Sequence, residues 1–362
     1  MTTTAMKAAV LASALLAVTL SLGAAPPVKE KGAAPTVPHQ RKNNLSPLPA
    51  KEQGASSHAP FEAGDCSVCH RSSDPKAPGP ITSPVNELCL GCHEDFQKVL
   101  ARKSGHVPAR KNCANCHNPH NSRQAKLLVE EPAALCLGCH EKIKVLAIQS
   151  AVKHDPVTKG AKCANCHNPH GANVEHLLTQ LPFRLCIGCH GKDGVMDQEG
   201  RKLTNIKKLL EGNPKHHGPV SAEDCSACHN PHGFKYFRLL TTEYPATFYS
   251  PYDPRLYALC FECHEPRVAA EPETTTLTQF RDGRRNLHYV HINKSERGRT
   301  CRACHEVHAS KQPHQLRDGV PYGSKGWLLK LNYTKSPTGG SCEKTCHGTY
   351  TYNNSGKPSK KE

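Results

Sequence analysis

Cysteine and histidine recur together ten times along this chain of 362 residues. All 20 cysteines stand in closely spaced pairs, and a histidine directly follows the second cysteine of every pair. Nine pairs read CxxCH, with the residues Cys66, Cys69 and His70; Cys89, Cys92 and His93; Cys113, Cys116 and His117; Cys136, Cys139 and His140; Cys163, Cys166 and His167; Cys186, Cys189 and His190; Cys225, Cys228 and His229; Cys260, Cys263 and His264; and Cys301, Cys304 and His305. The tenth, with Cys342, Cys346 and His347, has one extra residue between its cysteines and reads CEKTCH.

Two thiols separated by two residues and followed by histidine are the attachment pattern of c-type haem. The thiols add to the two vinyl groups on one porphyrin edge, and the adjacent imidazole binds the iron as proximal ligand. Disulfides would not require a histidine after every pair, a zinc site needs only four ligands, and a thioredoxin-like CxxC needs a βαβ unit that the sequence lacks. We therefore expect about ten covalently bound haem c groups, with the histidine of each motif as proximal ligand.

The CEKTCH pair leaves two interpretations open. A longer loop still brings both sulfurs to the porphyrin edge, and His347 keeps its place beside the second cysteine. The alternative is an empty pair or one closed by a disulfide.

Nine further histidines stand at repeated offsets from the motifs, and we interpret them as distal iron ligands. Five upstream histidines precede successive pairs of motifs by seven to ten residues: His58, His106, His154, His217 and His291. Four +3 histidines follow a proximal histidine by three residues: His120, His170, His232 and His308. A second imidazole closes the sixth coordination site of the iron and favours electron transfer. Five candidates remain for the tenth distal ligand, of which His314 is favoured and His288 is the runner-up: His39, His176, His216, His288 and His314.

The length of the chain between two histidines limits which iron each can reach. Two axial imidazoles on one iron hold their Cα atoms about 12–13 Å apart, whereas three extended residues span only about 10–11 Å. We therefore expect His120 to bind a haem other than that of His117, either the partner haem of its own pair or a neighbouring one. An upstream histidine has enough chain to reach the first haem of its pair, although the spacing does not fix its iron. In the first pair Ser73 stands where a +3 histidine would be.

Composition agrees with an interior filled by a group other than side chains. Only 37% of the residues are hydrophobic and 5% aromatic, and the chain contains 29 prolines and 26 glycines. A chain of this length normally buries large apolar side chains in two or three cores, and haem packing can replace them. The formal charge of +16 offsets haem propionates in this interpretation, so we expect no nucleic-acid partner.

The N-terminal residues have the pattern of an export signal. Lys7 is the only charged residue in the first 25, an apolar run covers residues 8–22, and small residues follow it. We expect a signal peptide over 1–25 and an exported, periplasmic or extracellular protein with no integral membrane segment after cleavage. The alternative, a retained anchor, is disfavoured because the apolar run is short for a membrane span.

The motifs divide the remaining chain into repeats. In the first three pairs the two motifs begin 23 residues apart. We expect a flexible Pro- and Lys-rich linker over 26–57, a tail over 349–362, and a decahaem region over 58–348 made of five two-haem repeats, 58–105, 106–153, 154–216, 217–290 and 291–348. Apolar periodicity predicts short helices at 93–100, 140–148 and 203–212. The predicted fold is mostly irregular, with short α-helices wrapped around a chain of haems and few or no strands.

The segments LCLGCH and CANCHNPH resemble the doubled-CxxCH class of multihaem c-type cytochromes over about residues 58–347. The resemblance is greatest to the decahaem periplasmic or extracellular cytochromes of bacteria that pass electrons to outside acceptors. It implies bis-histidine haems in a closely stacked chain. It also implies redox partner proteins, such as other cytochromes, an outer-membrane porin or an extracellular acceptor.

We therefore predict an electron carrier with about ten haems and no catalytic residues. Two alternatives stay open. A multihaem reductase acting on nitrite or hydroxylamine would need an open or unusual sixth site, and the sequence has no CxxCK motif and many spare histidines. A filament-forming extracellular cytochrome, or another oligomer, is compatible with the repeats.

Overall fold

The computed structural model describes residues 45–48, 56–322, 327–343 and 346–356. The expected signal peptide and most of the expected linker lie outside the described residues, as does the end of the C-terminal tail. Within the described part, no helix is long and apolar enough to cross a membrane.

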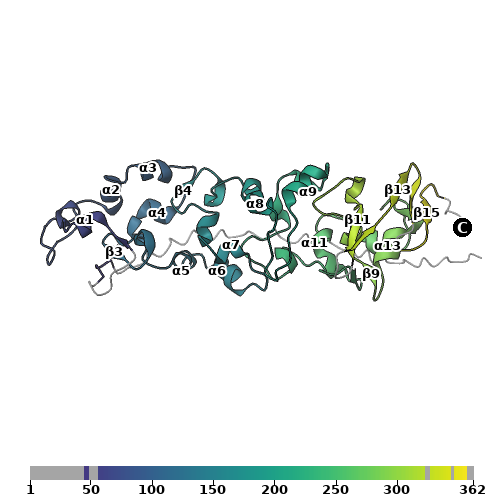
Figure 1. Cartoon of the computed structure of the whole chain (residues 1–362), viewed down its shortest axis with the longest axis horizontal. Coiled ribbons are helices and arrows are strands. Elements are labelled where there is room, and N and C mark those ends of the chain that lie inside the picture. Colours follow the sequence, from purple (N-terminus) through teal and green to yellow (C-terminus); the bar gives the residue numbers. More distant parts are fainter. Residues whose placement is uncertain (1–44, 49–55, 323–326, 344–345, 357–362) are drawn as a thin grey trace, which may run out of the picture. The chain divides into compact units, whose positions relative to one another are not determined.

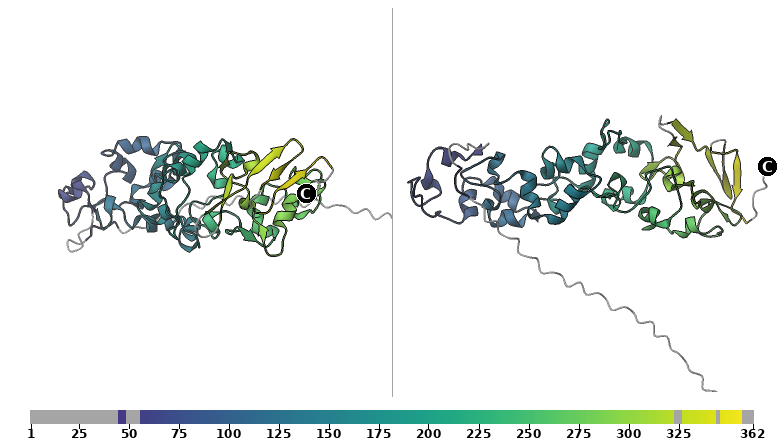
Figure 2. Two further views of the ribbon diagram at one scale, coloured as in Figure 1. Left: turned by 45° about the vertical axis from the view of Figure 1, so that its right-hand side comes forward. Right: turned by 90° about the horizontal axis from the view of Figure 1, so that it is seen from below.

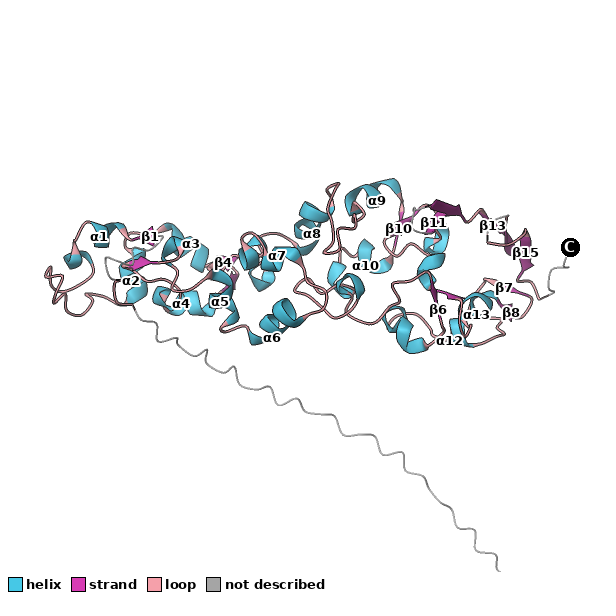
Figure 3. Cartoon of the chain, turned by 60° about the horizontal axis from the view of Figure 1, so that its bottom comes forward, coloured by secondary structure: helices cyan, strands magenta, loops and turns pink. Residues whose placement is uncertain are grey.

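Short helices joined by irregular segments make up most of the described chain (Figures 1 and 3). Among the described residues, the longest α-helix has nine residues and no strand exceeds four. The predicted fold class is therefore confirmed. The α-helices are α1 (Ala59–Glu62), α2 (Val85–Leu90), α3 (Asp95–Leu100), α4 (Val107–Lys111), α5 (Pro132–Leu137), α6 (Glu141–Lys144), α7 (Asp155–Thr158), α8 (Pro182–His190), α9 (Ile206–Gly212), α10 (Gly218–Ser221), α11 (Ala258–Phe261), α12 (Arg267–Ala270) and α13 (Leu287–Ile292).

The three helices predicted from apolar periodicity are present with shifted ends. The stretch 93–100 forms α3, and 203–212 forms α9. The stretch 140–148 forms α6, which continues into a π-helical turn over Val145–Gln149.

The two motifs of a repeat adopt different local structures. The first motif begins on a 3₁₀ turn, as at Cys66–Val68 and Cys113–Asn115. The second motif lies on or at the end of an α-helix, as in α2, α5, α8 and α11. In both, the N–H of the histidine donates to the carbonyl of the first cysteine, as from His70 to Cys66 at 2.8 Å and from His93 to Cys89 at 2.9 Å. One helical turn therefore holds both cysteines and the histidine together.

Four of the five upstream histidines are the N-cap residues of short helices. His58, His106, His154 and His217 precede α1, α4, α7 and α10, each with extended backbone and with proline at the second helical position. Proline suits the first turn of a helix because the N–H that it lacks would have no partner there. The His-x-Pro pattern thus fixes where the helix starts. His291 differs, since it lies inside α13.

Antiparallel strand pairs join the residues just before one repeat to the repeat that follows it. The residues just before an upstream histidine pair with the residues just after the +3 histidine of the next repeat. These inter-repeat strand pairs are β1 (Ser56–Ser57) with β3 (Asn121–Ser122), β2 (Ser104–Gly105) with β4 (Gly171–Ala172), the single bridge of Val152 with Phe234, and β5 (Lys215–His216) with β10 (Ala309–Ser310). Gly171 of β4 also packs closely against α3, because a Cβ on Gly171 would lie 2.3 Å from the carbonyl oxygen of Val99.

The C-terminal part of the described chain contains most of the longer strands. Strand β11 (Gly319–Tyr322) pairs with β12 (Trp327–Lys330), and β13 (Tyr333–Ser336), β14 (Gly339–Cys342) and β15 (Tyr350–Asn353) form an antiparallel sheet (Figure 2). Two shorter strand pairs complete the list of bounds, with β6 (Tyr249–Ser250) against β9 (Gly298–Arg299) and β7 (Arg281–Asp282) against β8 (Arg285–Asn286).

A small apolar core occupies the fourth repeat and the start of the fifth. It consists of Leu240, Tyr244, Tyr257, Ala269 and Ile292. Two of these residues, Tyr244 and Tyr257, lie in the extra chain that separates the two motifs of the fourth repeat. The longer spacing therefore supplies apolar side chains that the compact repeats lack.

Candidate haem-binding sites

Every proximal histidine of the ten motifs faces a second imidazole. The ring centroids of the facing pairs lie 6.0–6.4 Å apart. The ring planes lie within 9–19° of one another in nine pairs and at 37° in the tenth. The pairs are His70–His120, His93–His58, His117–His170, His140–His106, His167–His232, His190–His154, His229–His308, His264–His217, His305–His288 and His347–His291.

The separation fits one iron atom between two axial nitrogens. With metal–nitrogen bonds of about 2.0 Å and a ring nitrogen about 1.1 Å from its centroid, two such imidazoles have centroids about 6.2 Å apart. In the described residues, no three His, Cys, Asp or Glu side chains gather as the ligands of a bare metal ion. The donor set of each site is thus two imidazoles with two thiols beside one of them, which suits a covalently attached haem.

Hydrogen bonds fix the tautomer of the first-motif histidines. Nδ1 of His70, His117, His167, His229 and His305 donates to the carbonyl of the residue nine positions later, at 2.7–2.9 Å. Donation from Nδ1 leaves the lone pair on Nε2, which is the usual arrangement of a metal-bound histidine.

The residues that supply these carbonyls have left-handed backbone. They are Gly79, Lys126, His176, Arg238 and His314, with φ between 55° and 71°. The spare histidines His176 and His314 thus contribute a backbone oxygen to a neighbouring imidazole. Sequence reasoning missed this loop because any residue type can provide a carbonyl.

Distal imidazoles have similar partners. Nδ1 of His106 and His154 donates to the carbonyls of Pro169 and Pro231 in the following repeat, each at 2.8 Å. Nδ1 of His120 donates to the carbonyl of Leu45 at 2.8 Å. Leu45 falls within the expected linker, so this part of that segment contacts the second repeat.

Burial favours the neutral, metal-binding form of these imidazoles. It lowers the pKa of His288 to about 4 and lowers the pKa of several others, because an imidazolium loses hydration when it is buried. The others include His106, His120, His154, His170, His190, His217, His229, His232, His291 and His305.

The +3 histidines pair backwards along the chain. His120 lies opposite His70, in the first motif of the preceding repeat, and His170, His232 and His308 likewise lie opposite His117, His167 and His229. Each CxxCHxxH segment therefore contributes to two sites, which belong to the first motifs of adjacent repeats.

The upstream histidines pair within their own repeats. His58 lies opposite His93, and His106, His154, His217 and His291 likewise face the second motif. The spacing along the chain left open which iron these histidines reach, and the structure places them opposite the second motif, not the first. The first-motif site receives its second imidazole from the next repeat, so the upstream histidine faces the second motif.

Backward pairing explains both irregularities of the sequence. The first repeat has no predecessor, so Ser73 can replace a +3 histidine there without leaving a site incomplete. In the fifth repeat the second imidazole comes from within the chain before it: the structure places His288 of α13, not the favoured His314, opposite His305.

Side chains of the Asn-Pro-His segments hold the +3 histidines in place. Oδ1 of Asn118, Asn168 and Asn230 accepts a hydrogen bond from the backbone N–H of His120, His170 and His232, respectively, at 3.0–3.1 Å. Asn commonly closes such a turn onto the residue two positions later. The threefold recurrence of Asn-Pro-His is a signal that could have revealed this role from sequence.

Cysteines of consecutive repeats touch one another. In the first four repeats, the first cysteine of the second motif hydrogen-bonds to the first cysteine of the next repeat, which raises its own pKa and lowers that of the partner. The hydrogen bond from its partner lowers the pKa of Cys113 to about 7 and that of Cys163 to about 6. The four contacts are Cys89–Cys113, Cys136–Cys163, Cys186–Cys225 and Cys260–Cys301.

Within each repeat the two motifs are also close. Burial first, and then the nearby thiols of Cys89 and Cys92, raise the pKa of Cys69. The second cysteine of the first motif has the same kind of neighbour in the other four repeats. The ten cysteine pairs therefore form a continuous series in the order of the sequence.

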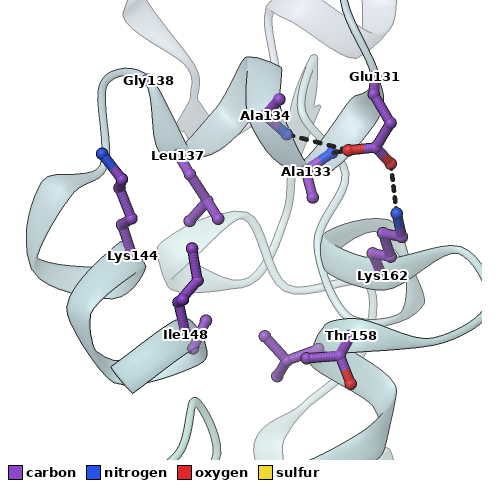
Figure 4. A pocket seen from close by; sticks show the side chains of 11 residues that line it. Glu131, Ala133, Ala134, Leu137, Gly138, Lys144, Ile148, Thr158 and Lys162 are labelled. Carbon is purple, nitrogen blue, oxygen red and sulfur yellow. Dashed lines mark hydrogen bonds and ion pairs between the residues drawn. The ribbon is translucent and has the colours of Figure 1, made fainter. Parts of the chain in front are cut away.

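An ion pair supports one junction between repeats. Glu131 accepts hydrogen bonds from the N–H groups of Ala133 and Ala134 at 2.9 and 3.1 Å, which caps α5, and it pairs with Lys162 next to Cys163 (Figure 4). An open pocket of about 500 Å³ beside this pair is lined mainly by apolar side chains, including Leu137 and Ile148.

Comparison with known proteins identifies the repeated unit. A family model described as the doubled CXXCH motif matches residues 58–98, 106–145, 154–195 and 217–269. Each match begins at an upstream histidine and contains both motifs of its repeat. The chain belongs to the doubled-CxxCH family of multihaem c-type cytochromes. The matches end before the fifth repeat, which contains CEKTCH. A search of curated proteins found no match.

Membership in this family settles the general chemistry. The doubled motifs bind haem c covalently through their cysteines, and they support a role in electron transfer. The paired cysteines and facing imidazoles described above are the groups available to hold haem.

Proposed function

We propose that this doubled-CxxCH cytochrome is an electron carrier with ten bis-histidine haem c groups and no substrate chemistry. The observation that carries the proposal is the pairing of all ten motif histidines with a second imidazole at 6.0–6.4 Å. Bound haem supplies a one-electron Fe(III)/Fe(II) couple, and two axial histidines leave no coordination site for a substrate.

The protein residues hold and connect the sites. Carbonyls at Nδ1 orient the proximal imidazoles. Each +3 histidine belongs to the haem site of the preceding repeat. The proximal histidine three residues before it belongs to the haem site of its own repeat. This arrangement, together with the cysteine contacts, keeps successive sites adjacent, which electron transfer requires.

The same pairing weighs against the reductase alternative. A multihaem reductase of the nitrite or hydroxylamine type would need one motif whose histidine has no facing imidazole. CEKTCH departs from the CxxCH pattern, so His347 is the first candidate for a motif histidine without a facing imidazole. The ring centroid of His291, however, lies 6.4 Å from that of His347.

The cellular setting follows from the sequence pattern and belongs to the proposal. We infer that the protein is exported and acts in the periplasm or outside the cell, where it exchanges electrons with other cytochromes, an outer-membrane porin complex or an extracellular acceptor. Assembly into filaments is the alternative, and electron microscopy of secreted material tests it.

The intact mass of the purified holoprotein tests the number of haems. The proposal requires ten haem increments on the mature chain. Nine increments would contradict it, and replacing both Cys342 and Cys346 by Ser would then leave the haem count unchanged instead of lowering it by one.

A further inference from the structure

One residue breaks the pattern of the Asn-Pro-His segments. In the second, third and fourth repeats the residue after the first-motif histidine is Asn118, Asn168 or Asn230. The fifth repeat has Glu306 at this position. A carboxylate there has a charge and a reach that the asparagines lack.

The carboxylate of Glu306 contacts a distal imidazole. Its Oε1 lies 3.3 Å from Nδ1 of His308, and its Oε2 lies 2.9 Å from Nη1 of Arg317. Arg317 also donates from Nε to the carbonyl of His305 at 2.9 Å. The side chains of Glu306 and Arg317 are only 18% and 13% exposed and that of His308 is 33% exposed, so these contacts are partly shielded from water.

The partner of His308 differs in kind from those of the other histidines whose Nδ1 contacts are described. His106, His120 and His154 donate to backbone carbonyls, whereas His308 donates to an anion. Hydrogen bonds to charged acceptors are stronger than neutral ones, and a carboxylate behind a metal-bound histidine raises the basicity of that ligand.

We propose that Glu306 is a positioning residue that lowers the reduction potential of the haem held between His229 and His308. A more basic imidazole donates more charge to the iron and stabilises Fe(III) over Fe(II). Arg317 offsets the charge of Glu306, so the effect comes from the hydrogen bond. The inference rests on the proposed ligation of that haem by His229 and His308.

A lower reduction potential at this haem would affect how the carrier stores electrons. The site joins the third, fourth and fifth repeats, because His229 stands three residues before His232, which faces His167. A haem that accepts an electron less readily than its neighbours separates the electrons stored on its two sides during partial reduction.

The test is a redox titration of the intact holoprotein followed by visible absorption. In Glu306→Gln one haem of ten should shift upward in potential while the other nine stay in place. A tenfold change in the preference for Fe(III) corresponds to about 59 mV for a one-electron couple, which a wild-type minus variant difference titration resolves.

A converse variant and a ligand variant separate the possible failures. Asn230→Glu introduces the same acceptor beside His232 and should lower the potential of one haem. His308→Met should change the axial ligation of one haem. If His308→Met changes ligation but neither carboxylate variant shifts a potential, the tuning proposal is wrong. If His308→Met changes no haem, the proposed ligation is wrong as well.

Discussion

Replacement of His120 by Met tests the backward pairing of the +3 histidines. The imidazole of His120 lies 6.1 Å from that of His70 and three residues from His117. The variant should therefore change the haem attached to Cys66 and Cys69. Removal of the hydrogen bond from Nδ1 to Leu45 costs about 1 kcal/mol, which leaves the protein folded.

The size of the spectral change follows from the number of sites. One haem of ten changes ligand, so about one-tenth of the haem absorbance should gain the features of His/Met ligation, with a raised potential. The ferric near-infrared spectrum shows the sulfur-to-iron charge-transfer band of such a site. A matched control is His176→Asn, which removes an imidazole that faces no motif histidine and keeps a residue type that tolerates left-handed backbone.

Haem deletion assigns the new band. Ser substitutions at Cys66 and Cys69 in the His120→Met background should abolish it, and Ser substitutions at Cys113 and Cys116 should not, provided that intact mass shows nine haems in each. The reasoning is refuted if the band disappears with the Cys113 and Cys116 haem instead.

Two further predictions concern the chain ends and the junctions. His288→Met should change the ligation of the haem on Cys301 and Cys304, whereas His314→Asn should leave every haem spectrum unchanged; equal effects would contradict the placement of His288 opposite His305. Gly171→Ala puts a Cβ 2.3 Å from the carbonyl oxygen of Val99 in α3 and should destabilise the holoprotein by roughly 1–3 kcal/mol in thermal denaturation. Gly212→Ala, with open space around its Cβ, should not. An unchanged melting temperature for Gly171→Ala would show that β4 does not pack against α3 as described.

The sequence predicts the haem chemistry well because covalent attachment needs cysteine and histidine at fixed short spacing. Cys66, Cys69 and His70 are close neighbours along the chain, so the motif that they form does not depend on the tertiary fold. The conclusion that His120 cannot bind the haem of His117 likewise needs only the length of three extended residues.

The choice of partner could not be predicted because it depends on the path of the next repeat. His120 reaches His70 because β1 pairs with β3 and brings the second repeat against the first. A similar pairing of β5, just before His217, with β10, just after His308, brings the fifth repeat against the start of the fourth. These strands have two residues each, and no local propensity marks so short a strand.

The tenth distal histidine shows the same limit. His314 lies between the last two motifs, where a distal ligand is expected. Its backbone is left-handed, however, and its carbonyl oxygen accepts the hydrogen bond from Nδ1 of His305. His288 reaches the site because α13 begins at the preceding residue, with Asn286 as its cap. The spacing of histidines alone could not distinguish a backbone role from a side-chain role.

The spin state of the ferric holoprotein tests the central claim most directly. Electron paramagnetic resonance with quantified intensities should show low-spin bis-histidine haems only, since all ten motif histidines face a second imidazole. One high-spin haem per molecule would contradict the account, because it would mean an open coordination site and a place for substrate chemistry.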